Sequence, residues 1–428
     1  MITVKEPMPH TAFELPNGLC IVTEEMHHTH SVSMGVYTKV GSRYEPASLS
    51  GVSHFLEHMF FKGTARRNAK QISEAIEGVG GALNAYTSYD STVYFAKVAN
   101  IHVDRAVDTL SDMLLHSLFD AKEVEKERRV IVEEINMSLD QPSDWVHQLL
   151  DETLWGDQPL GRDIAGTSES VNGITREDLL AYRDQHYTFA NTVISIAGNL
   201  PNTTMVEAWT RAIEGYGQGV RRQPQVTLPP LPGPRVRVMN KKTEQANFCL
   251  GLPAVSYSDP DRRPLQVLNS ILGGSMSSRL FQEIREERGL AYSVYSDMAE
   301  YDDAGKWVIY AGVEVGKVKE AISAVLGELR KLRDEGITSE ELQHVKEQNK
   351  GGMLLGLETT GAVASRNGSH ILRYGKIIPV EQVVAEIEAV TQEDVLRVAQ
   401  RLIKTEALNL SLIGPYKDQA AFRDLLVI

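Results

Sequence analysis

The sequence predicts an α+β protein with two duplicated halves, each a mostly antiparallel sheet with helices packed on it. Three observations favour this fold class. Residues 13–137 and residues 235–353 follow one order of predicted elements: strands, helix, a strand pair and a helix pair. Between them, residues 215–234 are rich in Gly and Pro and have almost no hydrophobic periodicity, which is typical of a linker. We therefore expect a first half at 1–214, a linker at 215–234 and a second half at 235–428.

The composition is that of an ordinary globular protein. The chain has 428 residues, of which 42% are hydrophobic and 24% charged, and this length favours two domains over a single core. Its formal net charge of −13 argues against nucleic acid as a partner, because phosphate binding needs clustered Lys and Arg. Cys20 and Cys249 lie far apart and imply no disulfide framework, which favours a reducing compartment.

The sequence shows no targeting or membrane signal. Residues 1–18 have neither the charged and apolar regions of a signal peptide nor an Arg-rich amphipathic helix. No apolar run approaches membrane-spanning length. We therefore expect a cytoplasmic protein without a membrane partner.

The first elements are a hairpin, a strand and a short helix. Residues 11–25 place a Pro-Asn-Gly turn between two β-prone runs, and a further strand follows at 31–42. Ser50 as N-cap and Gly63 just past the end predict a helix over 51–62. Glycines close a second helix at 68–81, and two β-prone runs at 82–98 then form a strand pair.

The helix at 51–62 carries ionisable side chains among apolar ones. His54 and His58 are four residues apart, so both imidazoles point the same way and can share one divalent cation. Glu57 lies at the edge of that face, where its carboxylate can reach a metal-bound water without ligating the metal. His-x-x-Glu-His is also the inverted zincin motif. A chance arrangement on a solvated helix is the alternative, but nearly all the neighbouring residues are apolar.

Two helices follow, at 103–118 and 121–139. The second begins at Asp120, with Glu123 three residues later in a capping-box arrangement. Its apolar face carries Glu127 and Glu134, which are seven residues apart and therefore point the same way. Charged residues on an inward face need a partner. The alternative is a surface helix held by ion pairs between residues four apart.

The remainder of the first half contains a strand within 186–200 and a helix near 204–214. The second half then predicts strands in 235–255, a helix in 264–289, a strand pair in 291–313 and a helix pair in 317–353. The repeat does not extend to the candidate ligands, because residues 276–284 stand where the first half has its His-x-x-Glu-His motif.

Three ordered motifs carry a resemblance to a known family. Residues 54–64, residues 84–87 (Asn-Ala-Tyr-Thr), and Glu127 followed by Glu134 resemble the pitrilysin-type zinc peptidases. Within that family, the chain is most similar to the mitochondrial processing peptidase β-subunit and its bacterial relatives. The resemblance covers essentially the whole chain, including the linker.

The resemblance implies a role for each matching residue. It implies that one Zn²⁺ per chain is bound by His54, His58 and Glu134, and that Glu57 is the general base. Glu127 would support the ligand set from outside it. The residues implied to contact the substrate are Asn84 and Ala85 along an edge strand, Phe61 beside the scissile bond, and Arg285 with Tyr292 at substrate carbonyls.

The implied activity is that of a zinc endopeptidase acting on unfolded peptides or presequence-like segments inside a closed chamber. The family also implies a pair of chains, and because this chain carries both the zinc motif and the Arg/Tyr pair, we expect a homodimer. Two alternatives stay open: an inactive structural or assembly subunit of the same fold, and a metal-binding scaffold that presents peptides. The presence of His54, His58, Glu134 and Glu57 favours the enzyme, since a scaffold needs no general base.

Overall fold

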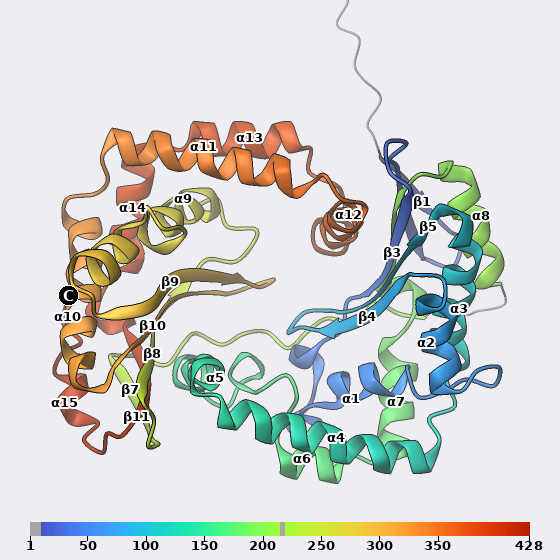
Figure 1. The fold of residues 1–428 in the computed structure, drawn as a ribbon, viewed down its shortest axis with the longest axis horizontal. Helices are drawn as coiled ribbons and strands as arrows, with labels where there is room; N and C mark the ends of the chain where they lie inside the picture. The colour runs from blue at the N-terminus through green and yellow to red at the C-terminus, as the bar shows by residue number, and fades with distance from the viewer. Residues whose placement is uncertain (1–9, 215–218) are drawn as a thin grey trace, which may run out of the picture. The chain divides into compact units, whose positions relative to one another are not determined.

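The computed structural model describes residues 10–214 and 219–428. The chain forms two compact units (Figure 1). The first comprises the described residues of 1–135, 163–225 and 354–378, and the second comprises 136–162, 226–353 and 379–428. The linker predicted at 215–234 falls in part outside the described residues, at 215–218; its residues 219–234 form neither helix nor strand.

The first unit is built on a six-stranded sheet in the order β1-β2-β6-β3-β5-β4. Neighbouring strands are antiparallel except for β2 and β6, which are parallel. Strand β4 lies at one edge of this sheet. The strands are β1 His10–Glu14, β2 Cys20–Glu25, β3 Ser31–Thr38, β4 Ala82–Thr87, β5 Thr92–Ala99 and β6 Thr192–Gly198. The predicted hairpins and the strand within 186–200 are confirmed.

The helices of this unit follow the predicted order. They are α1 Val52–Met59, α2 Ala69–Glu77, α3 Val103–His116, α4 Ala121–Asp140, α6 Ser168–Gly173, α7 Arg176–His186 and α8 Asn202–Ala212. Helix α1 is shorter than the predicted 51–62, because the N–H groups of Phe61 and Lys62 donate to carbonyls three residues back, not four, so that the chain ends in turns. The side chain of Asp120 accepts the backbone N–H of Lys122 at 2.8 Å, so Asp120 starts α4 as predicted.

The second unit repeats the plan with a five-stranded sheet in the order β7-β11-β8-β10-β9. Its strands are β7 Arg235–Asn240, β8 Gln245–Ala254, β9 Ala291–Glu300, β10 Gly305–Glu314 and β11 Asn409–Gly414. Its helices include α9 Arg262–Gly273, α10 Val318–Asp334, α11 Ser339–Gly356, α13 Val380–Ala389, α14 Gln392–Leu402 and α15 Ala420–Arg423. The helix predicted over 264–289 is divided, since α9 ends at Gly273 and a separate short helix covers Phe281–Glu287. The α+β fold with two similar sheets is confirmed.

The two sequence halves exchange one helix each. Helix α5, Pro142–Trp155, packs on β8 and β11 of the second unit, whereas α12, Thr360–Tyr374, packs on β3 and β6 of the first (Figure 1). Lys306 on β10 pairs with Asp151 on α5 at 2.5 Å, and both side chains are buried. The predicted halves at 1–214 and 235–428 are the two copies of the sequence repeat. The compact units have other boundaries, because each unit includes one helix from the other half.

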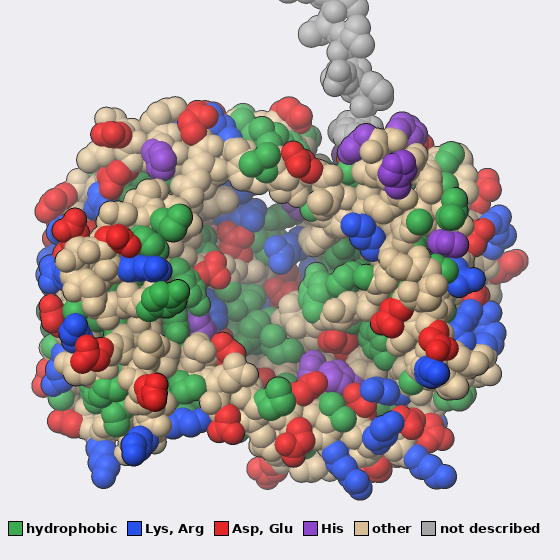
Figure 2. All heavy atoms as spheres, in the orientation of Figure 1, with side chains coloured by type: hydrophobic (Ala, Val, Ile, Leu, Met, Phe, Trp, Pro, Cys, Tyr) green, Lys and Arg blue, Asp and Glu red, His purple; other side chains and the backbone are tan. Residues whose placement is uncertain are grey.

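Charged side chains of both signs lie on the surface. On the face shown in Figure 2, Lys and Arg side chains are interspersed with Asp and Glu side chains. Among the described residues, every helix is too short or too polar to cross a membrane.

Candidate active site

Three candidate metal ligands come together in the first unit. His54 and His58 extend from α1 and Glu134 from α4, and one ligand atom of each lies within 4.8 Å of the others. The two imidazole rings are 4.6 Å apart between centroids, and Nε2 of His58 is 3.5 Å from a carboxylate oxygen of Glu134. Within residues 10–214 and 219–428, this is the one cluster of His, Cys, Asp and Glu with such geometry.

Helix α1 presents the two histidines because its other face is apolar and buried. Phe55, Leu56 and Met59 point into the core. The helix start differs from the prediction: Gly51, not Ser50, occupies the N-cap and has a positive φ of 93°. The carboxylate of Glu45 accepts the backbone N–H groups of Gly51 and Ser53, both at 2.8 Å. A buried carboxylate therefore satisfies the helix start and complements its dipole.

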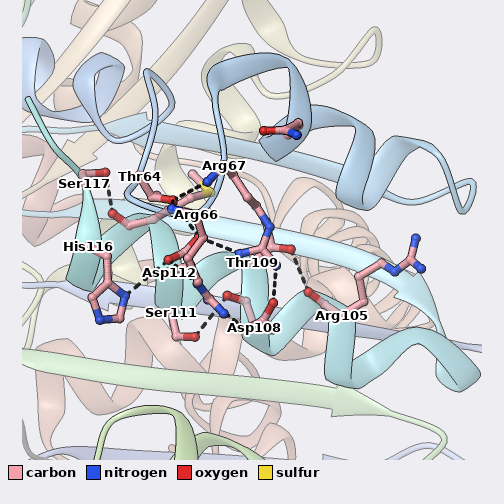
Figure 3. A network of polar contacts seen from close by, with 12 residues as sticks. Thr64, Arg66, Arg67, Arg105, Asp108, Thr109, Ser111, Asp112, His116 and Ser117 are labelled. Carbon is pink, nitrogen blue, oxygen red and sulfur yellow. Dashed lines mark hydrogen bonds and ion pairs between the residues drawn. The ribbon is translucent and has the colours of Figure 1, made fainter. Parts of the chain in front are cut away.

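The segment after α1 is held by a buried aspartate on α3 (Figure 3). The Asp112 carboxylate accepts hydrogen bonds from the Thr64 hydroxyl at 2.8 Å, from Arg66 at 2.9 Å and from Arg67 at 2.6 Å. Burial alone would raise the pKa of Asp112, but these three donors hold it below its usual range. Both ends of the histidine-bearing helix are thus tied to buried carboxylates.

Glu127 contacts His58 on the side of the ring opposite Glu134. Its carboxylate accepts the Nδ1 hydrogen of His58 at 2.8 Å and pairs with the Lys62 ammonium at 2.6 Å. Burial opposes the charged forms, but these contacts lower the pKa of Glu127 and raise that of His58. With Nδ1 committed to Glu127, Nε2 of His58 is the nitrogen that faces Glu134. The inward orientation predicted for Glu127 is confirmed, since it is 2% exposed.

The donor set fits a zinc ion. His54 keeps Nδ1 buried without a hydrogen-bond partner among the described residues, and burial lowers the pKa of its imidazole to about 4. A neutral imidazole near pH 7 has a lone pair free for a metal. Two imidazoles and one carboxylate are a ligand set typical of catalytic zinc sites, which leave a fourth position open.

Glu57 lies beside the ligands on α1 and is not part of the ligand cluster. Its Oε2 accepts a hydrogen bond from the Thr87 hydroxyl of β4 at 2.5 Å. Burial is the largest influence on Glu57 and raises the pKa of its carboxyl. A carboxyl group with a raised pKa beside a metal site is suited to receive and return a proton.

The predicted substrate-contact residues of the first unit lie on strand β4, which packs against α1, and just after α1. Asn84 and Ala85 lie on edge strand β4, where the Ala85 N–H donates to the Asn84 side-chain oxygen at 2.8 Å. An edge strand offers backbone groups to an added strand. Phe61 comes two residues after the end of α1, and its ring centroid lies 6.5 Å from that of Tyr94.

Arg285 and Tyr292 belong to the second unit and contact each other there. The Arg285 guanidinium donates to the Tyr292 carbonyl at 2.7 Å and lies 4.7 Å from the centre of the Tyr292 ring. The Tyr292 side chain is open to solvent, with the residue 77% exposed. The two predicted residues therefore lie together, with the Tyr292 side chain at the surface.

Sequence reasoning missed Glu45, Lys62 and Thr87 as supports of this site. Thr87 closes the Asn-Ala-Tyr-Thr motif, and strand alternation places its side chain on the same side as that of Ala85. That alternation was the available signal for Thr87. Nothing local marks Glu45, because its partners are backbone N–H groups six and eight residues later.

Comparison with known proteins assigns the family. Residues 20–168 match the family described as Insulinase (Peptidase family M16), and residues 173–349 match the Peptidase M16 inactive domain. Together with the fold and the His-His-Glu cluster, this defines a two-domain peptidase-like protein. The chain belongs to peptidase family M16.

The similar curated proteins are named zinc proteases. The chain is 41% identical to the uncharacterized zinc protease YmxG of Bacillus subtilis, covering 93% of this chain and 97% of that protein. It is 40% identical to an uncharacterized zinc protease of Streptomyces coelicolor, covering 96% of this chain and 90% of that protein. Family membership and these names support a metallopeptidase that uses zinc.

Solved structures share the fold along the whole chain. A protease from Helicobacter pylori has a TM-score of 0.88 at 23% identity, covering 95% of this chain and 99% of that chain. A chain of complex III2 from Candida albicans has a TM-score of 0.84 at 19% identity, covering 98% of this chain and 100% of that chain. At these identities the likeness establishes the fold alone.

Proposed function

We propose that this protein is a zinc-dependent endopeptidase that cleaves unfolded peptides. The observation that carries the proposal is the His54–His58–Glu134 cluster with Glu57 beside it, in a chain whose relatives are named zinc proteases. We propose that each chain binds one Zn²⁺ through these three ligands. We also propose a cytoplasmic location. The resemblance to processing-peptidase β-subunits favours presequence-like segments as substrates.

The chain's own residues divide the reaction between them. Zinc, when bound, supplies Lewis acidity that polarises a carbonyl and brings the pKa of a water towards about 7. Glu57 takes the proton of the attacking water through the carboxylate oxygen that Thr87 does not occupy, and returns it to the leaving amine. Glu127 holds His58 in the orientation that directs Nε2 to the metal.

Substrate binding uses the edge of the first sheet. An extended peptide pairs with β4 at Asn84 and Ala85, and its carbonyl replaces the Asn84 oxygen as acceptor of the Ala85 N–H. Phe61 lines the pocket beside the scissile bond. Arg285 and Tyr292 hold substrate carbonyls inside a closed chamber, which excludes folded proteins.

Removal of zinc should abolish peptide hydrolysis. A quenched-fluorescent unstructured peptide is incubated with the wild type, with and without a zinc chelator, and zinc is assayed in the same samples. We expect cleavage that stops on chelation and returns with added Zn²⁺. The His58→Ala variant should bind no zinc at this site, and Glu127→Gln should bind zinc about 10–100-fold more weakly.

Glu125→Gln is the matched control for the zinc measurements, because Glu125 lies exposed on the same helix. Its zinc affinity should equal that of the wild type. Zinc binding without cleavage of any member of a diverse peptide library would instead favour a peptide-presenting scaffold. Absence of both zinc and cleavage would favour an inactive structural subunit.

We also propose a homodimer in which the Arg285–Tyr292 pair of one chain serves the zinc site of the other. Activity per chain should then fall on dilution, in step with the dimer fraction measured by sedimentation. Full activity from a monomer would contradict this arrangement.

A further inference from the structure

Thr87 ends strand β4 with its side chain directed to one side of the sheet edge. Exposure alternates along the strand: Ala82, Asn84 and Tyr86 are exposed, whereas Leu83, Ala85 and Thr87 are half-buried. Helix α1 packs against β4. Because successive strand residues point to opposite faces, the half-buried set is the one that turns towards neighbouring structure. Thr87 reaches Glu57 of α1 from that set.

The contact between these two side chains is short and specific. The Thr87 hydroxyl donates to Oε2 of Glu57 at 2.5 Å, and no other hydrogen bond reaches the Glu57 carboxylate from the described residues. A β-branched threonine has few rotamers, whereas a glutamate has three side-chain torsions to restrain. One fixed donor therefore determines which carboxylate oxygen is engaged and which one stays available.

The turn after Thr87 is itself firmly anchored. The N–H groups of Ser42 and Arg43 donate to the carbonyls of Ser88 and Tyr89, at 3.2 and 3.0 Å. The fully buried Arg43 guanidinium also donates to Asp90 at 2.8 Å. Side chains that locate a reacting group need such backbone support.

The backbone at Gly41 lies so close to this turn that no larger residue fits at position 41. A Cβ added to Gly41 would lie 2.1 Å from the Ser88 carbonyl oxygen. Two residues beyond Arg43, Glu45 binds the start of α1. Residues 41–45 thus hold both the end of β4 and the beginning of the helix that carries Glu57.

We propose that Thr87 is a positioning residue that orients the Glu57 carboxylate for proton transfer. This inference rests on the proposed peptidase function. By engaging Oε2, Thr87 leaves Oε1 to receive the proton of the attacking water. The strand that pairs with the peptide therefore also holds the general base. Strand β4 would thus position both the substrate backbone and the Glu57 carboxylate.

Two variants test this role, Thr87→Val and Thr87→Ser. Valine keeps the shape of threonine and removes the donor, whereas serine keeps the donor. With the quenched-fluorescent peptide, Thr87→Val should lower kcat by about 10-fold or more, with little change in KM. Thr87→Ser should keep most of the wild-type kcat. Zinc affinity, measured by competition with a chromophoric chelator, and the thermal unfolding midpoint should match the wild type in both variants.

Several results would overturn the positioning role. Wild-type kcat in Thr87→Val would show that the hydrogen bond is dispensable, while the proposed peptidase function would stand. Equal losses in the valine and serine variants, or a loss that follows zinc affinity or thermal stability, would show a merely structural role. A wild type that binds zinc but cleaves no peptide would overturn the proposed function, and this inference with it.

Discussion

Replacement of Glu57 with Gln should lower peptide hydrolysis by about 10²–10⁴-fold while zinc content stays at the wild-type level. Glutamine has the same shape as glutamate, and its carbonyl oxygen can still accept the hydrogen bond that Thr87 donates to Oε2. An amide cannot take up a proton from the attacking water. The cluster of His54, His58 and Glu134 does not include Glu57, so the metal site should remain intact. Initial rates and zinc content, measured on the same preparation, check both parts.

Glu133→Gln is the matched control for this experiment. Glu133 is exposed on α4 and directly precedes Glu134, so it tests the loss of a nearby charge without touching the base. Its rate should equal that of the wild type. If Glu57→Gln kept full activity with zinc bound, another group would have to serve as the base. If it lost zinc together with activity, Glu57 would belong to the metal site.

Replacement of Asp151 with Ala should lower the free energy of unfolding of the second unit by about 3–5 kcal/mol. The two carboxylate oxygens of Asp151 accept hydrogen bonds from the Lys306 ammonium, at 2.5 and 2.6 Å, and both residues are at least nine-tenths buried. Removing the carboxylate leaves an ammonium group with little access to water. The measurement is denaturant unfolding followed by tryptophan fluorescence, since Trp307 neighbours Lys306 on β10 and is fully buried.

Two further variants separate the ion pair from helix α5 as a whole. Asp144→Ala removes an exposed aspartate from the first turn of the same helix and should cost at most about 1 kcal/mol. Combining Asp151→Leu with Lys306→Met replaces the pair by apolar groups and should recover most of the lost stability. An unchanged transition in Asp151→Ala would mean that Lys306 reaches solvent, and the pair would then not hold α5 on its sheet.

Much of the candidate site was readable from the chain because it depends on local spacing. His54, Glu57 and His58 lie within five residues, and one helical turn fixes how they point. Seven-residue spacing likewise placed Glu127 and Glu134 on one face of α4. Periodicity alone could not distinguish their contacts: packing of α4 against α1 brings Glu127 to Nδ1 of His58 and Glu134 to Nε2.

The hydrogen bonds that hold the site in place could not be predicted from the sequence, because they join segments far apart in the chain. Asp112 accepts hydrogen bonds from Thr64, 48 residues away, and Thr87 donates to Glu57 across 30 residues. No periodicity records such partners, since each depends on how two elements meet. The start of α1 shows the same limit: Ser50 has the composition of an N-cap, but the buried Glu45 carboxylate takes that role.

The sequence by itself determined the α+β class, the repeated order of elements, the linker-like composition of 215–234 and the His-x-x-Glu-His helix, because all of these follow from periodicity, turn residues and spacing along the chain. Only the tertiary structure decided that α5 covers the sheet of the second unit and α12 that of the first. The physical reason is that an amphipathic helix specifies that its apolar face must be buried, but not against which sheet. That choice comes from complementary contacts such as the Lys306–Asp151 pair, which form only between folded elements.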